Sequence, residues 1–222
     1  MLSNVKVITV DGPSGVGKGT TSIALADHLG WHFLDSGAIY RALGWYANHT
    51  NVDLEDLTAV NALIGKYELK FIRDKILIDG DDVSSEVRHE RCGGWASKIA
   101  VSPIIRASLL QSQKEFRQAP GLVADGRDMG TVVFPDANLK IFLKASAKER
   151  GRRRFEQLRN TDPSVTISAL IDEIKHRDER DIKRATSPLK PAQDAIEIDS
   201  SDMSIEEVLN TVLVHASSAG IK

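Results

Sequence analysis

A glycine-rich loop near the start of the chain, set between an apolar strand and a helix, constrains the fold most. The β-branched run 5–10 predicts a strand, and residues 18–29 have the pattern of a helix. The loop that joins them consists of Gly12, Pro13, Ser14, Gly15, Val16, Gly17, Lys18, Gly19 and Thr20. Strand, glycine-rich loop and helix in this order predict a phosphate-binding loop, or P-loop, against the alternative of a plain connecting turn.

This composition suits phosphate binding because several backbone N–H groups must converge on phosphate oxygens, and glycine lets the chain curl that closely. Lys18 would reach the outer phosphates. The common pattern places Ser or Thr directly after the lysine, whereas here Gly19 intervenes, so Thr20 is the candidate for the hydroxyl that faces a metal. The Gly-Lys-Gly-Thr variant resembles the nucleoside monophosphate kinases, which implies ATP with Mg²⁺.

Further apolar runs along the chain predict an α/β fold. They are separated by stretches with helical periodicity, and they cover residues 31–34, 122–124, 139–143 and 195–198. Strands that alternate with helices favour a central parallel sheet flanked by helices on both faces.

Local signals predict several other elements. Capping-box spacing at Ser146 and at Ser204 predicts two helix starts, and Pro103 predicts a helix over 104–117. Residues 217–222 are expected to be a frayed tail.

A small β element is predicted within the first half of the chain. Residues 68–72 and 75–78 have the pattern of two strands joined by Arg73 and Asp74. A turn at 80–82 is expected to follow.

Charge and sulfur content exclude several classes of protein. The 222 residues carry 29 Lys+Arg against 31 Asp+Glu, a balance that disfavours a general nucleic-acid binder. The single Cys92 can form no internal disulfide, which fits a reducing compartment. Because no apolar run of about 18 residues occurs and the N-terminus leaves no room for a signal peptide, we expect a cytoplasmic protein with no membrane contact. We also expect a monomer.

Three more segments accompany the P-loop in order along the chain: residues 35–41, 123–136 and 177–184. Together the four motifs resemble bacterial cytidylate kinase over nearly the whole chain. The resemblance implies one P-loop kinase domain over 1–222, with an inserted acceptor-side element at 66–90 and a short lid at 148–162. It also implies transfer of the γ-phosphoryl group of ATP to CMP or dCMP, in pyrimidine nucleotide metabolism.

Charged side chains follow the predicted strands at the edge where parallel sheets bind ligands. Arg41 and Arg127 are suited to bidentate contact with an acceptor phosphate, with surface ion pairs as the alternative. Asp125 ends an apolar strand, where an acidic group can hold Mg²⁺ or its waters. A helix cap or an ion pair with Arg127 is the alternative for Asp125.

The resemblance assigns further roles. Lys18, Arg41, Arg127 and Asp128 would form the catalytic set, and Arg153 and Arg154 of the basic run 150–154 would bind ATP as part of the lid. A solvated helix face or an RNA contact are the alternatives for that run. The implied CMP-binding residues are Ser36, Arg41, Ser97, Arg106, Arg127, Asp128, Arg177, Asp181 and Arg184.

The spacing of Arg177, Asp181 and Arg184 places all three side chains on one helix face, with Arg180 pointing away from it. A solvated charge ladder is the alternative to a nucleotide-facing stripe. Among whole functions, the alternatives are a kinase for AMP, UMP or shikimate, a GTP switch and an RNA-binding module. The chain has no Asn-Lys-x-Asp motif of the kind that reads guanine.

Overall fold

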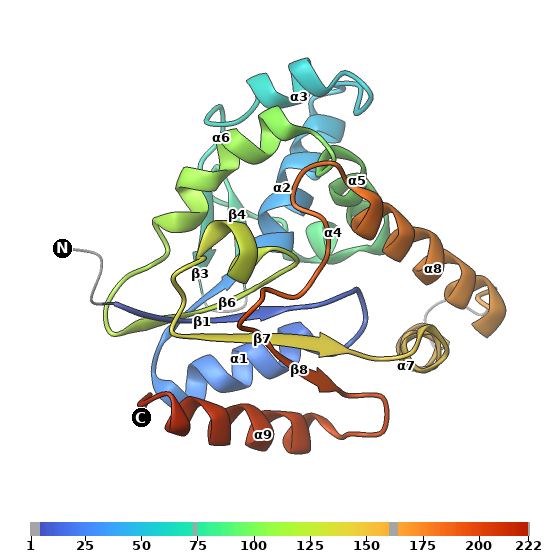
Figure 1. Ribbon diagram of the computed structural model, residues 1–222. Coiled ribbons are helices and arrows are strands. Elements are labelled where there is room, and N and C mark those ends of the chain that lie inside the picture. The colour runs from blue at the N-terminus through green and yellow to red at the C-terminus, as the bar shows by residue number, and fades with distance from the viewer. Residues whose placement is uncertain (1–4, 73–74, 160–163, 222) are drawn as a thin grey trace. The chain divides into compact units, whose positions relative to one another are not determined.

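The computed structural model describes residues 5–72, 75–159 and 164–221 (Figure 1). The chain divides into two compact units. Unit 1 contains the described residues of Met1–Leu34 and Lys114–Lys222, and unit 2 is Asp35–Gln113. The predicted connection at residues 73–74 and the end of the predicted lid at 160–162 lie outside the described residues.

Unit 1 is built on a five-stranded sheet in the order β2-β6-β1-β7-β8. Its strands are β1 (Lys6–Asp11), β2 (His32–Asp35), β6 (Gly121–Gly126), β7 (Leu139–Lys144) and β8 (Ile196–Asp199). β1 pairs in parallel with β6 and with β7, and β7 pairs in parallel with β8. The five strands lie at the five predicted apolar runs, so the parallel α/β architecture is confirmed.

Burial explains the strand order. The three central strands are apolar and almost wholly buried, whereas β2 and β8 at the two edges each have a single buried residue. Helices α1 (Lys18–Leu29) and α9 (Ile205–Ser218) lie against one face of this sheet, as Figure 1 shows. Their apolar faces join Ile8 and Ile141 in one hydrophobic core.

The other helical elements of unit 1 lie between the later strands. They are the short π-helix η2 (Met129–Val133) and the helices α7 (Ala147–Leu158) and α8 (Ile167–Lys183). α7 and α8 pack closely, because a Cβ on Gly151 would collide with the side chain of Ile171.

Unit 2 combines helices with a small antiparallel sheet. The sheet is β3 (Leu69–Ile72), β4 (Lys75–Ile78) and β5 (Asp81–Asp82), in that order. The helices are α2 (Ser36–His49), α3 (Leu57–Ala62), α4 (Ser84–Arg88), α5 (Glu90–Ile99) and α6 (Pro103–Lys114). Ile76, Ile78 and Val87 form a separate core with Ala42.

Several local predictions need correction. The expected frayed tail is wrong: α9 continues to Ser218, and Ile221 is 1% exposed because it packs into the core of unit 1. Residues 81 and 82 form strand β5 rather than only a turn. The helix predicted over 104–117 ends at Lys114.

The two capping-box predictions have different outcomes. Ser204 forms the full reciprocal box with Glu207. Ser146 accepts from the N–H of Glu149, but the Glu149 carboxylate binds Arg152 and Arg153 instead of returning to Ser146. The helix start is right, and the second half of the box is lost to stronger charge-assisted bonds.

No helix in the described ranges is long and apolar enough to cross a membrane.

Candidate active site

The P-loop connects β1 to α1 through glycine-dependent backbone geometry. Gly12 has φ 150°, and a Cβ there would collide with the carbonyl oxygen of Leu143 in β7. Gly17 caps α1 in the left-handed conformation, with φ 93°. A side chain would strain the loop at both positions, so glycine is required for a curl that leaves the first N–H groups of α1 available to anions.

Lys18 is the first residue of α1 and is only 7% exposed. Its Nζ donates to the carbonyl oxygen of Pro13 at 2.8 Å. Burial, followed by the positive charge of Arg127, lowers the pKa of Lys18 to about 7, although Asp125 acts in the opposite direction. A bound phosphate would reverse this shift, because an adjacent anion favours the ammonium form.

The predicted metal ligands are oxygen donors on neighbouring segments. Asp125 is buried near the end of β6, and its Oδ2 lies 3.4 Å from the position that a Cβ on Gly19 would take. Thr20, the next residue of α1, is exposed. A carboxylate and a hydroxyl beside a phosphate loop fit Mg²⁺, which takes one or two protein oxygens together with phosphates and water.

Asp11 ends β1 and fixes the segment that follows Asp128. Its two carboxylate oxygens accept from the N–H groups of Met129 and Gly130, at 2.9 and 2.8 Å. Burial raises the pKa of Asp11 to about 6, and the two backbone hydrogen bonds limit the rise. The carboxylate therefore ties the loop after β6 to the strand that leads into the P-loop.

A second charged cluster, the Asp181 cluster, consists of Asp181, Arg127, Arg177 and Arg184. Arg127 donates from Nε to Asp181 Oδ2 at 3.0 Å, and the Asp181 side chain is largely buried. Burial opposes ionisation of Asp181, but the charges of Arg127, Arg184 and Arg177 hold its pKa below the usual value. The cluster thus keeps one carboxylate ionised among three permanent cations.

Arg127 has an acidic partner on α8. The sequence offered an ion pair with Arg127 as one alternative for Asp125. The structure shows Arg127 paired with Asp181, 54 positions further along the chain. Asp128, the residue that follows Arg127 in the sequence, is buried.

Helix α8 separates its charged residues by face. Asp181 is buried and Arg180 is exposed, as their spacing predicts. Arg184 lies one residue beyond the helix, where its Nε donates to the carbonyl oxygen of Asp181 at 3.2 Å.

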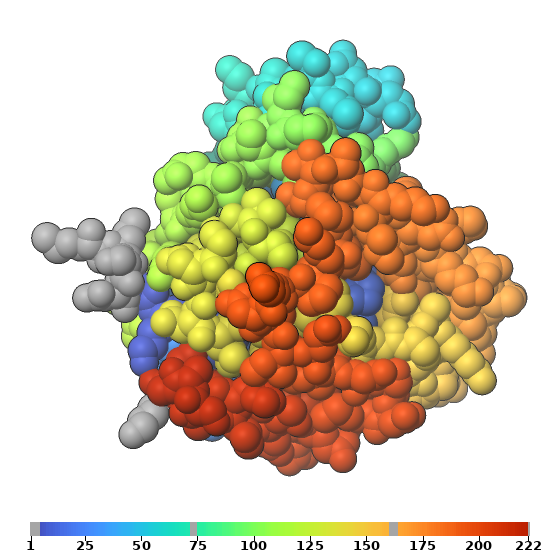
Figure 2. All heavy atoms as spheres, viewed as in Figure 1, coloured from blue at the N-terminus to red at the C-terminus, as the bar shows by residue number. Residues whose placement is uncertain are grey.

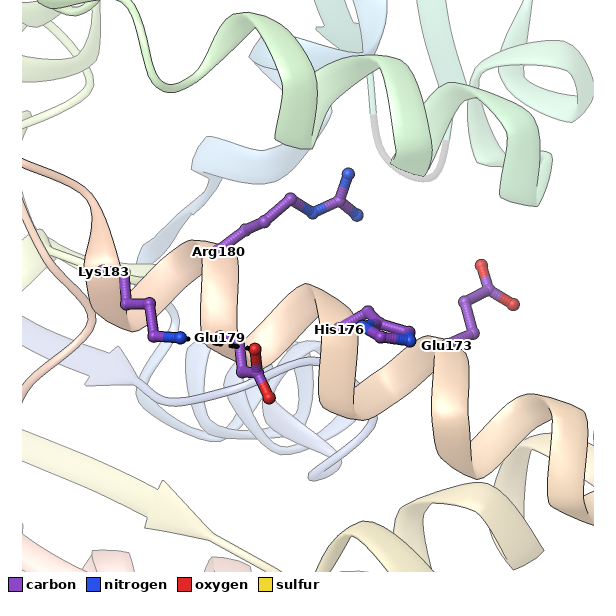
Figure 3. A pocket seen from close by; sticks show the side chains of 5 residues that line it. All are labelled: Glu173, His176, Glu179, Arg180 and Lys183. Carbon is purple, nitrogen blue, oxygen red and sulfur yellow. Dashed lines mark hydrogen bonds and ion pairs between the residues drawn. The ribbon is translucent and has the colours of Figure 1, made fainter.

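Arg180 belongs to an open pocket of about 610 Å³ along α8 (Figure 3). The pocket is lined by Glu173, His176, Glu179, Arg180 and Lys183. Glu179 and Lys183 form an ion pair at 3.4 Å, drawn as a dashed line in Figure 3. None of these five residues is a predicted site residue.

Four predicted acceptor residues lie in unit 2. Ser36 begins α2 and donates to Gln113 Oε1 at 2.6 Å, and Arg41 on the same helix donates to the carbonyl oxygen of Arg88 at 3.2 Å. Arg106 on α6 is buried, with its guanidinium 5.7 Å from the ring centre of Tyr40.

Ser97 is the fourth, on α5. Its Oγ is buried and has no hydrogen-bond partner among residues 5–72, 75–159 and 164–221. A buried hydroxyl without a partner is costly, so this atom is suited to a polar ligand. The glycine pair Gly93-Gly94 does not break α5.

The arginines of α7 differ in their partners. Arg153 binds Glu149 and the carbonyl oxygen of Ser200, and Arg154 donates to Gln157. Arg152 also binds Glu149, within the same helix. ATP contacts of Arg153 and Arg154 stay a prediction.

Sequence reasoning missed three residues at this site. Arg150 donates to the P-loop carbonyl of Ser14 and to Asp178 of α8. Asp11, described above, was also missed, although an acidic residue between a strand and a glycine-rich loop is a visible signal. Arg150 and Asp178 gave no such signal, because each occurs in a run of charges where any member could be solvated.

The family model and similar curated proteins point to the same family. The sequence matches the family described as cytidylate kinase over residues 8–218. A cytidylate kinase of Stutzerimonas stutzeri is 54% identical over 219 residues, which cover 96% of each chain. A cytidylate kinase of Shewanella denitrificans is 52% identical over 221 residues, which cover 97% of each chain.

Solved structures share the fold at much lower identity. An uncharacterised protein of Eubacterium ventriosum aligns with a TM-score of 0.52 and 13% identity, over 96% of this chain and 98% of that chain. At this identity the likeness concerns the fold alone.

Proposed function

The chain belongs to the cytidylate kinase family, and from that premise we propose that it transfers the γ-phosphoryl group of ATP to the phosphate of CMP or dCMP. The products are ADP and CDP or dCDP. The observation that carries this proposal is the contact between the P-loop and the helix of the Asp181 cluster. Arg150 Nη1 donates both to the P-loop carbonyl of Ser14 and to Asp178 of α8, the helix that carries Arg177 and Asp181.

On the donor side, the P-loop from Gly12 to Thr20 would bind the phosphates of ATP. Its backbone N–H groups and the N-terminus of α1 supply the positive potential, and Lys18 supplies a charge that phosphate binding restores. Arg153 and Arg154 are proposed to add charge from α7.

Mg²⁺ is proposed to accompany ATP. Thr20 and Asp125 would hold it, directly or through water, and the ion would neutralise charge on the phosphate oxygens. Asp125 suits this role because it is buried beside the start of α1.

On the acceptor side, Arg127 and Arg41 are proposed to bind the CMP phosphate. Arg177 and Asp181 would hold the sugar hydroxyls, and Arg184 would reach the base. The predicted contacts of Ser36, Ser97, Arg106 and Asp128 complete the CMP-binding set.

The chemistry needs no covalent enzyme intermediate, because the CMP phosphate is itself the nucleophile. Catalysis then consists of aligning two anionic substrates and neutralising their charge. Permanent guanidinium charges on the acceptor side and a chargeable lysine on the donor side are suited to that task.

The chain is further proposed to act as a cytoplasmic monomer without a nucleic-acid or membrane partner. Support for the compartment comes from Cys92, whose thiol is buried and donates to the carbonyl oxygen of Glu86.

An acceptor comparison tests the function. ADP release is measured by a coupled assay with CMP, dCMP, UMP and AMP as acceptors at equal concentration. We expect CMP or dCMP to give the highest kcat/KM. Equal activity with all four would contradict a cytidylate kinase.

A further inference from the structure

A single buried guanidinium joins three segments of unit 1: the P-loop, helix α8 and the connection between β7 and α7. Arg150, at the start of α7, is 4% exposed. Its Nε donates to the carbonyl oxygen of Ala145 at 3.0 Å, and its Nη1 donates to the carbonyl oxygen of Ser14 at 3.0 Å. Nη1 and Nη2 also bind the two carboxylate oxygens of Asp178, at 3.1 and 2.5 Å.

We propose that Arg150 and Asp178 are positioning residues, which hold α8 at a fixed distance from the P-loop and so align the acceptor with the phosphates of ATP. The inference rests on the proposed function, because it requires a donor at the P-loop and an acceptor at α8. Neither residue needs to touch a substrate.

The contacts form a short chain from donor site to acceptor site. Arg150 Nη1 is shared between Ser14 in the P-loop and Asp178 in α8, so one nitrogen atom separates the two segments. Asp178 is followed three residues later by Asp181 and preceded directly by Arg177.

Close packing of α7 against α8 and against the P-loop supports the same arrangement. Gly151, the residue after Arg150, leaves no space for a Cβ against Ile171 of α8. A Cβ on Gly15 of the P-loop would lie 3.4 Å from the Cβ of Arg150. Figure 1 shows the β1–α1 loop, in blue, close to α7, and Figure 2 shows a small blue patch at the surface beside the yellow and orange segments.

Arginine is the side chain that this junction requires. Its planar fork offers two parallel donors to a carboxylate and keeps others for the two carbonyl oxygens, whereas a lysine has a single nitrogen. The neighbouring Arg152 is exposed and binds Glu149 of its own helix, whereas Arg150 is buried and binds two other segments, the P-loop and α8.

The chemical consequence is a loss of alignment rather than of binding. Phosphoryl transfer is sensitive to displacements of about 1 Å between the reacting groups. A P-loop and an α8 that remain individually intact but shift against each other should still bind ATP and CMP separately, while the rate of transfer falls.

The experiment compares two Asp→Asn variants of the same helix. Asp178→Asn removes the charge that faces Arg150 and keeps the shape. Asp172→Asn is the matched control, because its carboxylate is exposed and pairs with the exposed Lys175 at 3.7 Å. kcat is measured for transfer to CMP, and the Kd of ATP and of CMP is measured by calorimetry, each without the other substrate.

We expect Asp178→Asn to lower kcat at least about tenfold while both Kd values stay within about twofold of the wild type. Asp172→Asn should leave all three quantities unchanged. An unchanged kcat in Asp178→Asn, or a loss of binding in proportion to the loss of kcat, would overturn the inference.

A double variant separates positioning from stability. Arg150→Met with Asp178→Leu replaces the ion pair by apolar side chains of similar volume, which can preserve stability. The double variant lacks the hydrogen bond to Ser14, so we expect kcat to stay low when measured below its own Tm. Recovery of wild-type kcat would show that the pair only stabilises the fold.

The wild type distinguishes this inference from the proposed function. Failure of the wild type to phosphorylate CMP contradicts the function itself. A wild type that phosphorylates CMP, together with a fully active Asp178→Asn variant, contradicts only the positioning role.

Discussion

The P-loop and the Asp181 cluster, the proposed donor and acceptor sites of unit 1, are built by different means. In the P-loop the backbone provides the site, and its one cation, Lys18, is buried with a pKa lowered to about 7. In the Asp181 cluster the side chains provide the site, and three guanidiniums surround an ionised carboxylate.

This difference determines how each of the two proposed sites accommodates its buried positive charge when no ligand is bound. Lys18 can relieve unfavourable burial by losing its proton, whereas arginine cannot. The proposed acceptor half therefore has Asp181 as a built-in counter-charge to arginines that stay charged. In the donor half, Asp125 and Asp11 offset only part of the effect of burial on the pKa of Lys18. Substitutions in the two halves should accordingly affect different substrates.

The largest effect is expected for Lys18→Ala, which removes the only side-chain cation of the P-loop itself. Turnover should fall about 10³-fold, because a preorganised donor to developing charge is worth about 3–4 kcal/mol. The fold should persist, which the circular dichroism spectrum and Tm check. Near-normal turnover by a folded variant would refute the role of the P-loop.

Arg127→Ala is the corresponding change on the acceptor side. It removes the hydrogen bond to Asp181 and the proposed contact with the CMP phosphate. We expect kcat/KM for CMP to fall about 10²-fold, with a much smaller change in ATP affinity. A defect confined to ATP would assign this arginine to the other substrate and break the comparison.

Asp181→Ala tests the counter-charge. Without this carboxylate, Arg127, Arg177 and Arg184 repel one another, and we expect KM for CMP to rise about tenfold. Arg180→Ala is the control, because Arg180 is exposed on another face of α8. Equal losses in the two variants would point to a general effect on the helix.

How far the sequence predicts these two halves depends on the separation of the interacting residues. The P-loop is contiguous, so Gly12, Gly17 and Lys18 were predictable from local backbone requirements. The ion pair of Arg127 with Asp181 joins residues 54 positions apart, and the contact of Arg150 with Ser14 spans 136. Local spacing holds no information on such partners.

Contacts between residues far apart in the sequence also explain the errors in the predicted fold. Ile221 is the penultimate residue and local rules predict a frayed end, but its burial depends on the core that α1 and the sheet provide. The strands were predictable because each apolar run is long enough to be read without knowledge of its neighbours.

An effect of similar size is expected for Asp128→Ala, which tests base selection. The carboxylate is proposed to accept a hydrogen bond from the exocyclic amine of cytosine, where uracil presents a carbonyl oxygen. The ratio of kcat/KM for CMP to that for UMP should narrow about tenfold. An unchanged ratio would mean that Asp128 does not contact the base and only orients Arg127.

The smallest effect sharpens the contrast between the two cations. At pH 8 Lys18 is largely neutral in the free protein, so binding of MgATP should take up about one proton as the phosphates raise the pKa of Lys18. Calorimetry in buffers of different ionisation enthalpy measures this uptake. The Lys18→Arg variant stays charged and should show no proton uptake. Equal uptake by the variant and the wild type would mean that Lys18 is not the group that takes up the proton.

The most direct test of the whole account follows the γ-phosphoryl group itself. The wild-type protein is incubated with ATP labelled with ³²P at the γ-position, Mg²⁺ and CMP, and the labelled products are separated. The account predicts that the label appears in CDP in amounts equal to the ADP formed, and that Lys18→Ala loses this transfer. Label found only in inorganic phosphate, with none in CDP, would contradict it.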